Sequence, residues 1–168
     1  TYFPDTSQAV WNSGYTRANY PHPEGDIFFG STLADFAYLA PGQVGFWVLL
    51  HEIGHALGLK HPFDDGGAGR PDFASLGISA LDAGFQTVMS YQVPYAADPL
   101  KASLLDQGYQ ATPMPLDILA AQQLYGANTS YHAGNDTYVL RDDGVVRTLW
   151  DAGGNDTLDM SLLFRPVD

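Results

Sequence analysis

The amino-acid sequence predicts an α+β fold, and three observations lead to this prediction. Apolar residues recur at helical spacing near the middle of the 168-residue chain and again after residue 115, whereas the residues after 126 read as short β-type runs broken by Asp and Gly. The apolar share of 45% and the aromatic share of 13% are sufficient for a hydrophobic core. We therefore expect one sizeable domain at residues 1–126 and a small β-rich unit at residues 127–168.

The composition argues against several classes of function. The formal net charge is −12 with only seven Lys and Arg, so nucleic acid is not an expected partner. No run approaches about 18 apolar residues, so no membrane span is expected. The first residues show no signal peptide, although export by another route would need none. The absence of cysteine excludes disulfides and Cys-ligated zinc, and seventeen Asp against two Glu indicate many turns and loops suited to calcium.

The first half of the chain is predicted to contain short strands, at residues 16–20 and 26–29, and then a buried helix from Gly45 to Leu57. The strands are separated by the breaker PHPEG. The helix is predicted because apolar residues recur at steps of three and four: Phe46, Leu49, Leu50, Ile53, Ala56 and Leu57. Gly58 is a natural end for this helix, and Pro62 prevents it from resuming.

Residues 62–115 are rich in Gly, Pro, Asp and Ser and predict a long irregular region, in which Asp64 and Asp65 belong to a surface loop. A second helix is predicted from Pro115, which suits a first turn, to Gly126, which ends it. Asp117 lies near its N-terminus, where negative charge is favourable. Four apolar residues of this helix share one face: Leu116, Leu119, Ala120 and Leu124.

After Gly126 the segments TYVLR, VVRTLW and TLDMSLLF read as strands separated by Asp/Gly turns. A short repeat lies here, because GNDTY from Gly134 recurs twenty residues later as GNDTL from Gly154. Each copy reads as a turn followed by a strand, and two copies are too few for a solenoid. This change of pattern places the predicted boundary near Ala127.

Three of the five histidines lie within eleven residues, together with one of the two glutamates. On a helix, His51 and His55 lie on one face, one turn apart, and can bind one Zn²⁺. Gly58 tolerates a positive φ, and the turn that it permits would return His61 toward the metal as a third ligand. Three imidazoles leave one position open, as a catalytic zinc requires, and Glu52 could reach a water there. Three histidines packed in a core are the alternative, and their polar nitrogens would need partners.

Residues 51–62 (HEIGHALGLKHP) resemble the zinc signature of the metzincins, and most closely that of the serralysin branch of secreted bacterial metalloproteases. Residues 88–91 (VMSY) resemble the Met-turn of that family. Residues 116–128 resemble the helix that closes its catalytic domain, and residues 150–157 (WDAGGNDT) resemble the start of its calcium-binding β-domain. The resemblance therefore spans roughly residues 45–160, which is most of the chain.

The resemblance implies a metzincin-like catalytic domain, with a mixed twisted sheet, a zinc-binding helix and a Met-turn, followed by the start of a calcium-binding β-roll-type domain. It also implies a secreted, extracellular zinc endopeptidase that hydrolyses proteins or peptides, with Glu52 as general base. Met89 would form an apolar floor beneath the zinc histidines. Tyr91 would ligate zinc and steady the reacting carbonyl, and an extended substrate would pair with an edge strand near residues 14–20. A proteinaceous inhibitor is a further implied partner.

The resemblance also implies calcium binding by the two Asp/Gly turns. The implied calcium-binding residues are His132, Gly134, Asp136, Asp151, Gly153, Gly154 and Asp156. The carboxylates and the backbone carbonyls of these residues are the hard oxygen ligands that Ca²⁺ prefers. His132 stands where the family usually has arginine. Plain Asx turns without a metal are the alternative interpretation.

The chain departs from the family at both ends. Fifty residues precede His51, fewer than in serralysin-like domains, and the full glycine-rich calcium repeats do not follow. The chain is therefore expected to be a fragment of a longer enzyme, a compact member, or a chain completed by another, in which case the remainder of its own chain is a partner. The alternative function is a non-catalytic, calcium-stabilised binding or structural module on a protease-like frame, and such a module would have no need of Glu52.

Overall fold

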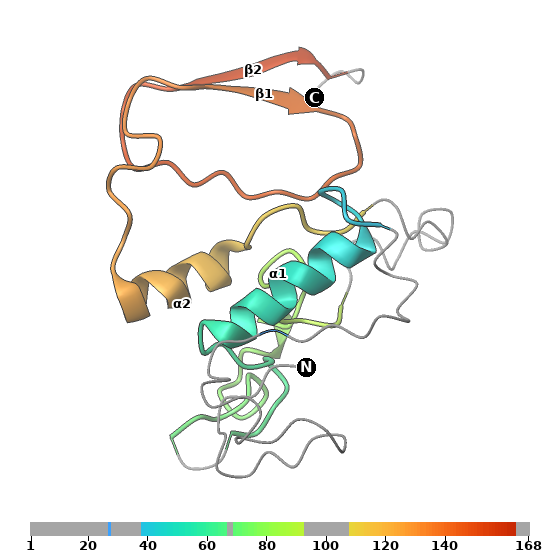
Figure 1. The fold of residues 1–168 in the computed structure, drawn as a ribbon. Helices are drawn as coiled ribbons and strands as arrows, with labels where there is room; N and C mark the ends of the chain where they lie inside the picture. Colours follow the sequence, from blue (N-terminus) through green and yellow to red (C-terminus); the bar gives the residue numbers. More distant parts are fainter. Residues whose placement is uncertain (1–26, 28–37, 67–68, 93–107, 164–168) are drawn as a thin grey trace, which may run out of the picture.

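A computed structural model describes residues 27, 38–66, 69–92 and 108–163. In chain order these residues form helix α1 (Val44–Ala56), a short 3-10 helix (Ser79–Leu81), helix α2 (Pro115–Tyr125) and strands β1 (Thr137–Arg141) and β2 (Thr157–Leu162) (Figure 1). Apart from residue 27, the strands predicted at 16–20 and 26–29, and the edge strand near 14–20, lie outside the described residues. Two helices and a small sheet agree with an α+β class.

Helix α1 begins and ends within one residue of the prediction. Its C-terminal end is closed by two backbone hydrogen bonds, from Gly58 N to His55 O (2.9 Å) and from Leu59 N to Gly54 O (3.0 Å). This pattern requires a left-handed residue after the helix, and Gly58 supplies it with a φ of 94°. The chain therefore reverses here and returns along the last turn of α1.

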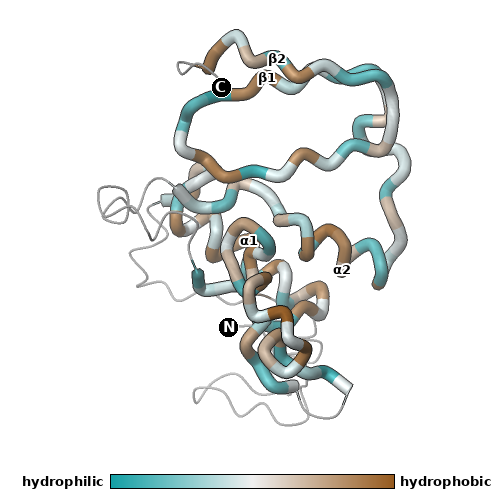
Figure 2. The backbone as a smooth tube through the Cα atoms, turned by 180° about the vertical axis from the view of Figure 1, so that it is seen from behind, coloured by the Kyte–Doolittle hydropathy of each residue, from teal (hydrophilic) through white to brown (hydrophobic). Residues whose placement is uncertain are grey.

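The apolar face of α1 is less buried than its pattern predicts. Ile53 is 38% exposed and Leu57 is 39% exposed. The described parts of α1 and α2 leave an apolar cleft of about 250 Å³ between them, to which Leu50, Ile118 and other side chains of both helices contribute. Figure 2 shows that hydrophobic residues occur along both helices. The prediction of a buried helix therefore holds only in part: Val44, Gly45, His51 and Gly54 are buried, and most other residues of α1 are half-buried.

Within the described residues, the hydrophobic core consists of Val88, Met89 and Met114. Four partly buried side chains pack against it, two of them from α1: Trp47, Leu50, Leu59 and Val146. Met89 is 2% exposed, and its Sδ atom lies so close to Gly54 that a Cβ at that position would collide with it. Gly54 is the residue before His55 in α1. A glycine within the helix therefore permits the turn at residues 87–90 to approach the histidine-bearing part of α1.

Helix α2 is anchored through its first turn. Leu116 N donates to Gln86 O (2.9 Å), and within the described helix the buried residue is the charged Asp117. Leu119 and Leu124 are 53% and 58% exposed, so the four apolar residues predicted to share a face do not form a buried stripe. The helix ends at Gly126, which has a φ of 85°, as its composition predicts.

Strands β1 and β2 form a two-stranded parallel sheet, drawn at the top of Figure 1. Thr137 pairs with Thr157 and Tyr138 with Leu158, so the register at the start of the sheet equals the twenty-residue spacing of the repeat, and it shifts by one residue before Arg141 pairs with Leu162. The prediction that each copy is a turn followed by a strand is therefore confirmed.

The segment VVRTLW was predicted to be a strand, and this prediction is wrong. Within the described part of the chain it forms a single bridge, between Gln110 and Val146, and is otherwise irregular. Ala111 N donates to Val146 O (2.8 Å), and Thr148 N donates to the hydroxyl of Thr112 (2.8 Å). These hydrogen bonds link the segment to residues 110–112 rather than to β1 or β2. The boundary near residue 127 stays a prediction.

A candidate metal centre and a carboxylate cluster

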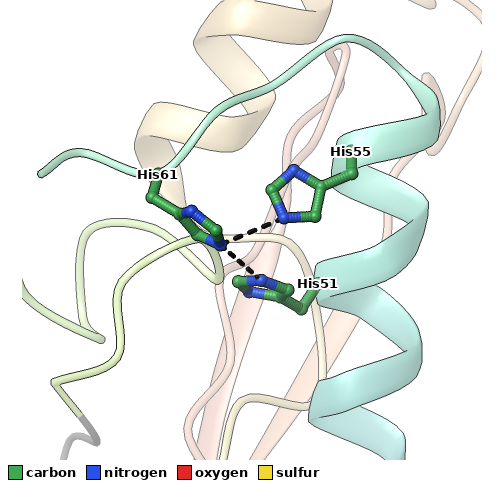
Figure 3. A group of neighbouring side chains, drawn as sticks. All are labelled: His51, His55 and His61. Carbon is green, nitrogen blue, oxygen red and sulfur yellow. Dashed lines mark hydrogen bonds between the residues drawn. The ribbon is translucent and has the colours of Figure 1, made fainter. Parts of the chain in front are cut away.

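Three imidazole rings converge at the C-terminal half of α1 (Figure 3). His51 and His55 extend from successive turns of α1, and His61 reaches them from the segment that follows the helix. The Nε2 atom of His61 lies 3.1 Å from Nε2 of His51 and 3.1 Å from Nε2 of His55. The reversal at Gly58, anticipated from the sequence, therefore brings together the three histidines that the spacing predicts to be ligands.

The other nitrogen of each ring faces an oxygen atom. The Nδ1 pairs are His51 with the carbonyl of Val88 (2.8 Å), His55 with the carbonyl of Leu59 (2.9 Å) and His61 with the carboxylate of Asp64 (2.7 Å). Carbonyl and carboxylate oxygens only accept hydrogen bonds, so each Nδ1 carries the ring proton and donates it. Each Nε2 is then left with a lone pair.

This donor set fits a zinc ion. Three lone pairs that face one another with no proton between them repel, and a cation among them removes that repulsion. Neutral imidazoles that bind through one nitrogen and donate from the other to an oxygen are characteristic zinc ligands. His51, His55 and His61 thus form a group that could hold a metal ion.

Burial lowers the pKa of two of these rings. Desolvation is the main cause that lowers the pKa of His51 and of His55 below the ordinary histidine value of 6.5, and the neighbouring imidazole of His61 lowers both further. The hydrogen bonds to Val88 and Leu59 act in the opposite direction. Since only the neutral ring can bind a metal, the lowered pKa favours the metal-binding form.

Glu52 lies in the same cleft as the three rings. The cleft has a volume of about 410 Å³, and Tyr91, Lys60 and Arg70 also line it. Glu52 follows His51 directly on α1 and is half-buried. The fold therefore brings the candidate base and the candidate ligands to one solvent-connected space.

Tyr91 contributes its hydroxyl at the point where the rings meet. Its Oη atom lies 3.1 Å from Nε2 of His61, although the residue as a whole is 57% exposed. Phe63 stacks on His61 with a ring separation of 4.9 Å and lies 5.0 Å from the Tyr91 ring. Desolvation is the main cause that raises the pKa of Tyr91, so its hydroxyl keeps its proton at neutral pH.

The role of Asp64 was missed by the sequence interpretation, which placed it in a surface loop without an assigned contact. Both residues do lie in an irregular segment, where the Asp64 side chain is 46% exposed and Asp65 is exposed, but the Asp64 carboxylate also accepts the Nδ1 proton of His61. The available signal was the position of an acidic residue three places after the third histidine. Phe63 was also missed, and an aromatic residue in a Pro-Phe-Asp-Asp run carries no comparable signal.

The residues predicted to bind calcium lie in two turns that precede β1 and β2. Carboxylate oxygens of Asp136, Asp151 and Asp156 all lie within 4.8 Å of one another. Asp136 N donates to Oδ1 of Asp156 (2.9 Å), which ties one turn to the other. Nδ1 of His132 lies 3.0 Å from Oδ1 of Asp136, and His132 has a positive φ of 50°. We call Asp136, Asp151 and Asp156 the carboxylate cluster.

The glycines of these turns allow the turns to stack closely. Gly154 has a φ of 133°, and a Cβ at this position would collide with the carbonyl oxygen of Gly134. Gly153 N donates to Oδ1 of Asp151 (2.7 Å). The predicted Gly134, Gly153 and Gly154 therefore lie in the same two turns as the cluster.

Tyr138 supports the carboxylate cluster, and the sequence interpretation missed it. Its hydroxyl donates to Oδ2 of Asp151 (2.5 Å), and this hydrogen bond is the main cause that raises the pKa of the Tyr138 phenol. Tyr138 belongs to β1, where an aromatic residue is an ordinary strand residue. Only its hydrogen bond to Asp151 distinguishes Tyr138 from an ordinary strand tyrosine.

No protein-family model matches the chain. Curated relatives nevertheless match most of it. It is 33% identical over 178 residues to a serralysin of Proteus mirabilis, an alignment that covers 98% of this chain and 32% of the relative. It is 37% identical over 131 residues to the metallopeptidase AprA of Pseudomonas marginalis (70% of this chain, 27% of the relative). For the metalloprotease AprA of Pseudomonas entomophila the identity is 34% over 134 residues, with 71% and 27% covered.

The chain therefore spans about a third or less of the length of these relatives. The alignment that covers 98% of the chain includes the region of the three converging histidines. Among the residues that the structure describes, neither helix has the length and apolar character that a membrane crossing requires. Sequence similarity along nearly the whole chain and the converging histidines lead to one conclusion, that this chain belongs to the serralysin-like, metzincin-type proteases.

Proposed function

We propose that this chain carries the active centre of a zinc-dependent endopeptidase that hydrolyses peptide bonds in proteins. One observation supports this most directly: the Nε2 atoms of His51 and His55 both lie 3.1 Å from Nε2 of His61, in a cleft that also holds Glu52. The relatives named serralysin, metalloprotease and metallopeptidase agree with this chemistry.

In this proposal His51, His55 and His61 hold the zinc through Nε2, and Tyr91 adds its hydroxyl oxygen. Zinc held in this way acts as a Lewis acid, which polarises a carbonyl and makes water a nucleophile at neutral pH. The Nδ1 hydrogen bonds to Val88, Leu59 and Asp64 fix the tautomer and the orientation of each ring.

Glu52 acts as the general base. Its carboxylate accepts one proton from the water that attacks the scissile carbonyl, and then passes this proton to the nitrogen of the leaving amine. The bond between the carbonyl carbon and that nitrogen breaks as the amine departs. The reaction needs no nucleophilic side chain, which agrees with a chain that has no cysteine.

Tyr91 stabilises the charge that develops on the carbonyl oxygen. For this role the side chain swings away from the zinc, and its hydroxyl then donates a hydrogen bond to that oxygen. One well-placed donor of this kind lowers the barrier by about 2–4 kcal/mol. The exposure of the Tyr91 side chain allows a substrate to reach it.

We further propose that the carboxylate cluster binds Ca²⁺ as a structural ion. Three carboxylates within 4.8 Å repel one another unless a cation lies among them, and oxygen donors suit calcium. His132, Gly134, Gly153 and Gly154 lie in the same turns and would add backbone carbonyls. A calcium ion there would hold the turns before β1 and β2 together.

The cellular setting follows from the relatives in the same way. We propose a secreted, extracellular enzyme with protein or peptide substrates, a proteinaceous inhibitor as an additional partner, and the remainder of a longer chain as its structural context. This setting rests on the family resemblance of residues 51–62 and 88–91 and on membership of the serralysin-like proteases.

Casein hydrolysis tests the proposal. The purified chain is assayed after removal of metal, after addition of Zn²⁺, and after addition of Zn²⁺ with Ca²⁺. We expect proteolysis only with zinc and faster proteolysis with both ions. A chain that binds zinc but never hydrolyses casein would instead support the non-catalytic binding module.

A further inference from the structure

Asp117 is a buried carboxylate that the proposed reaction does not use. It is only 5% exposed, in the first turn of α2. Its oxygens accept three hydrogen bonds, from the hydroxyl of Thr87 (2.5 Å), from Val88 N (2.8 Å) and from Met114 N (2.8 Å). Two of these donors lie about thirty residues earlier in the chain. Asp117 therefore joins α2 to the turn at residues 87–90.

The same turn orients His51. The backbone nitrogen of Val88 donates to the Asp117 carboxylate, and the carbonyl oxygen of Val88 accepts Nδ1–H of His51 (2.8 Å) and Nε1–H of Trp47 (3.1 Å). Asp117 is thus separated from the His51 ring by a single residue. A change in the position of Val88 would move the acceptor that fixes the tautomer and the angle of that ring.

A helix cap alone does not account for this arrangement. The bond from Met114 N satisfies the free backbone donor at the start of α2, and an exposed carboxylate could make it. Burial raises the pKa of Asp117, so the buried charge has a cost, which the three hydrogen bonds offset. The hydroxyl of Thr87 also accepts Met89 N–H (3.0 Å), so the contact extends to the next residue of the turn.

We propose that Asp117 is a positioning residue for the zinc centre, which holds Val88 in place and through it sets the tautomer and orientation of His51. This inference rests on the proposed zinc site. It concerns a residue of α2 that is neither a ligand nor a base. Mutation of residues that orient metal ligands through hydrogen bonds commonly lowers metal affinity by about 10–100-fold.

Two variants separate this role from simple helix capping. Asp117→Ala removes all three hydrogen bonds, and we expect zinc affinity to fall by about 10–100-fold, measured by competition with a chromogenic chelator in the intact 168-residue chain. Asp117→Asn is the conservative variant. One amide oxygen can still accept from Val88 N and Met114 N, and its NH₂ can donate to the hydroxyl of Thr87, so we expect zinc affinity within about threefold of wild type.

A second measurement needs no zinc. In metal-free protein, long-range ¹H–¹⁵N spectra report which ring nitrogen of His51 carries the proton. We expect the Nδ1–H form in wild type and in Asp117→Asn, and a mixture of tautomers in Asp117→Ala. If Asp117→Ala does not fold, Thr87→Val provides the test, because it removes one contact to the carboxylate and leaves Asp117 in place. It should shift both readouts in the same direction by less.

Asp72→Ala is the matched control, because Asp72 accepts a backbone N–H, that of Ser75 (2.7 Å), in an exposed turn. It should leave zinc affinity and the His51 tautomer unchanged. The inference is overturned if Asp117→Ala binds zinc as tightly as wild type, if Asp117→Asn is as weak as Asp117→Ala, or if Asp72→Ala weakens zinc equally. A wild-type chain that binds no zinc would overturn the proposed function itself, which is a distinguishable result.

Discussion

The carboxylate of Asp64 accepts the Nδ1 proton of His61 at 2.7 Å, three residues along the chain from the ring that it orients. The Nδ1 atoms of His51 and His55 donate to backbone carbonyls instead. His61 is also the ring that comes from a loop rather than from α1. Its orientation therefore depends on a local side-chain contact.

Asp64→Ala should weaken zinc binding by about 10–100-fold, because it removes the acceptor that fixes the His61 tautomer. Asp64→Asn should lose less, since its amide oxygen can still accept. Chelator competition measures both affinities. Asp65→Ala, which removes the same charge one residue later, is the matched control and should bind zinc normally. Equal affinities for Asp64→Ala and wild type would contradict this role of Asp64.

Glu52→Gln should keep zinc and lose activity. The amide has nearly the same shape as the carboxylate but cannot accept the proton, and loss of a general base lowers kcat by about 10²–10⁴-fold. Metal analysis and casein hydrolysis are measured on the same preparation. Asp72→Asn removes one charge in an exposed turn and should retain full activity. Wild-type turnover in Glu52→Gln would refute the assignment of the base.

Metal-free protein should lose stability in mild acid. The pKa values of His51 and His55 are lowered in the folded state, so below the unfolded value of 6.5 the unfolded chain binds more protons than the folded chain. The contribution of these two histidines to the free energy of unfolding is therefore full above about pH 6.5. It decreases as the pH falls toward their lowered pKa values in the folded state. Thermal unfolding between about pH 8 and pH 5 measures this. A melting temperature that rises on acidification across that range would show the sign to be wrong.

Gly154→Ala should separate the two turns of the carboxylate cluster. The added Cβ would collide with the carbonyl of Gly134, at a φ of 133° that disfavours alanine, and such strain costs about 1–3 kcal/mol. We expect a lower melting temperature and a smaller increase on addition of Ca²⁺. Gly134→Ala is the control, since a Cβ on Gly134 would meet no described atom within 4 Å and the φ of this residue is not positive. A calcium response equal in all three proteins would argue for plain Asx turns.

Local spacing by itself determined a large part of this protein. The four-residue step from His51 to His55 places the two rings on successive turns of any helix, and Gly58 and Pro115 mark helix ends through their own backbone preferences. The twenty-residue repeat equals the register at the start of β1 and β2, because a parallel pair of similar turn-strand units aligns like residues. These features depend on contacts within a few residues or on the repetition of one unit.

Only the tertiary structure decided the partners of those residues. The acceptor of His51 is a carbonyl thirty-seven residues away, and the donors to Asp117 include two from a different turn of the chain. The incomplete burial of the apolar face of α1 and the single bridge at Val146 also depend on how separate segments approach each other. Hydrogen bonds and packing between distant segments have no fixed sequence spacing, so periodicity cannot specify them, whereas the backbone geometry of one helix turn is the same in every chain.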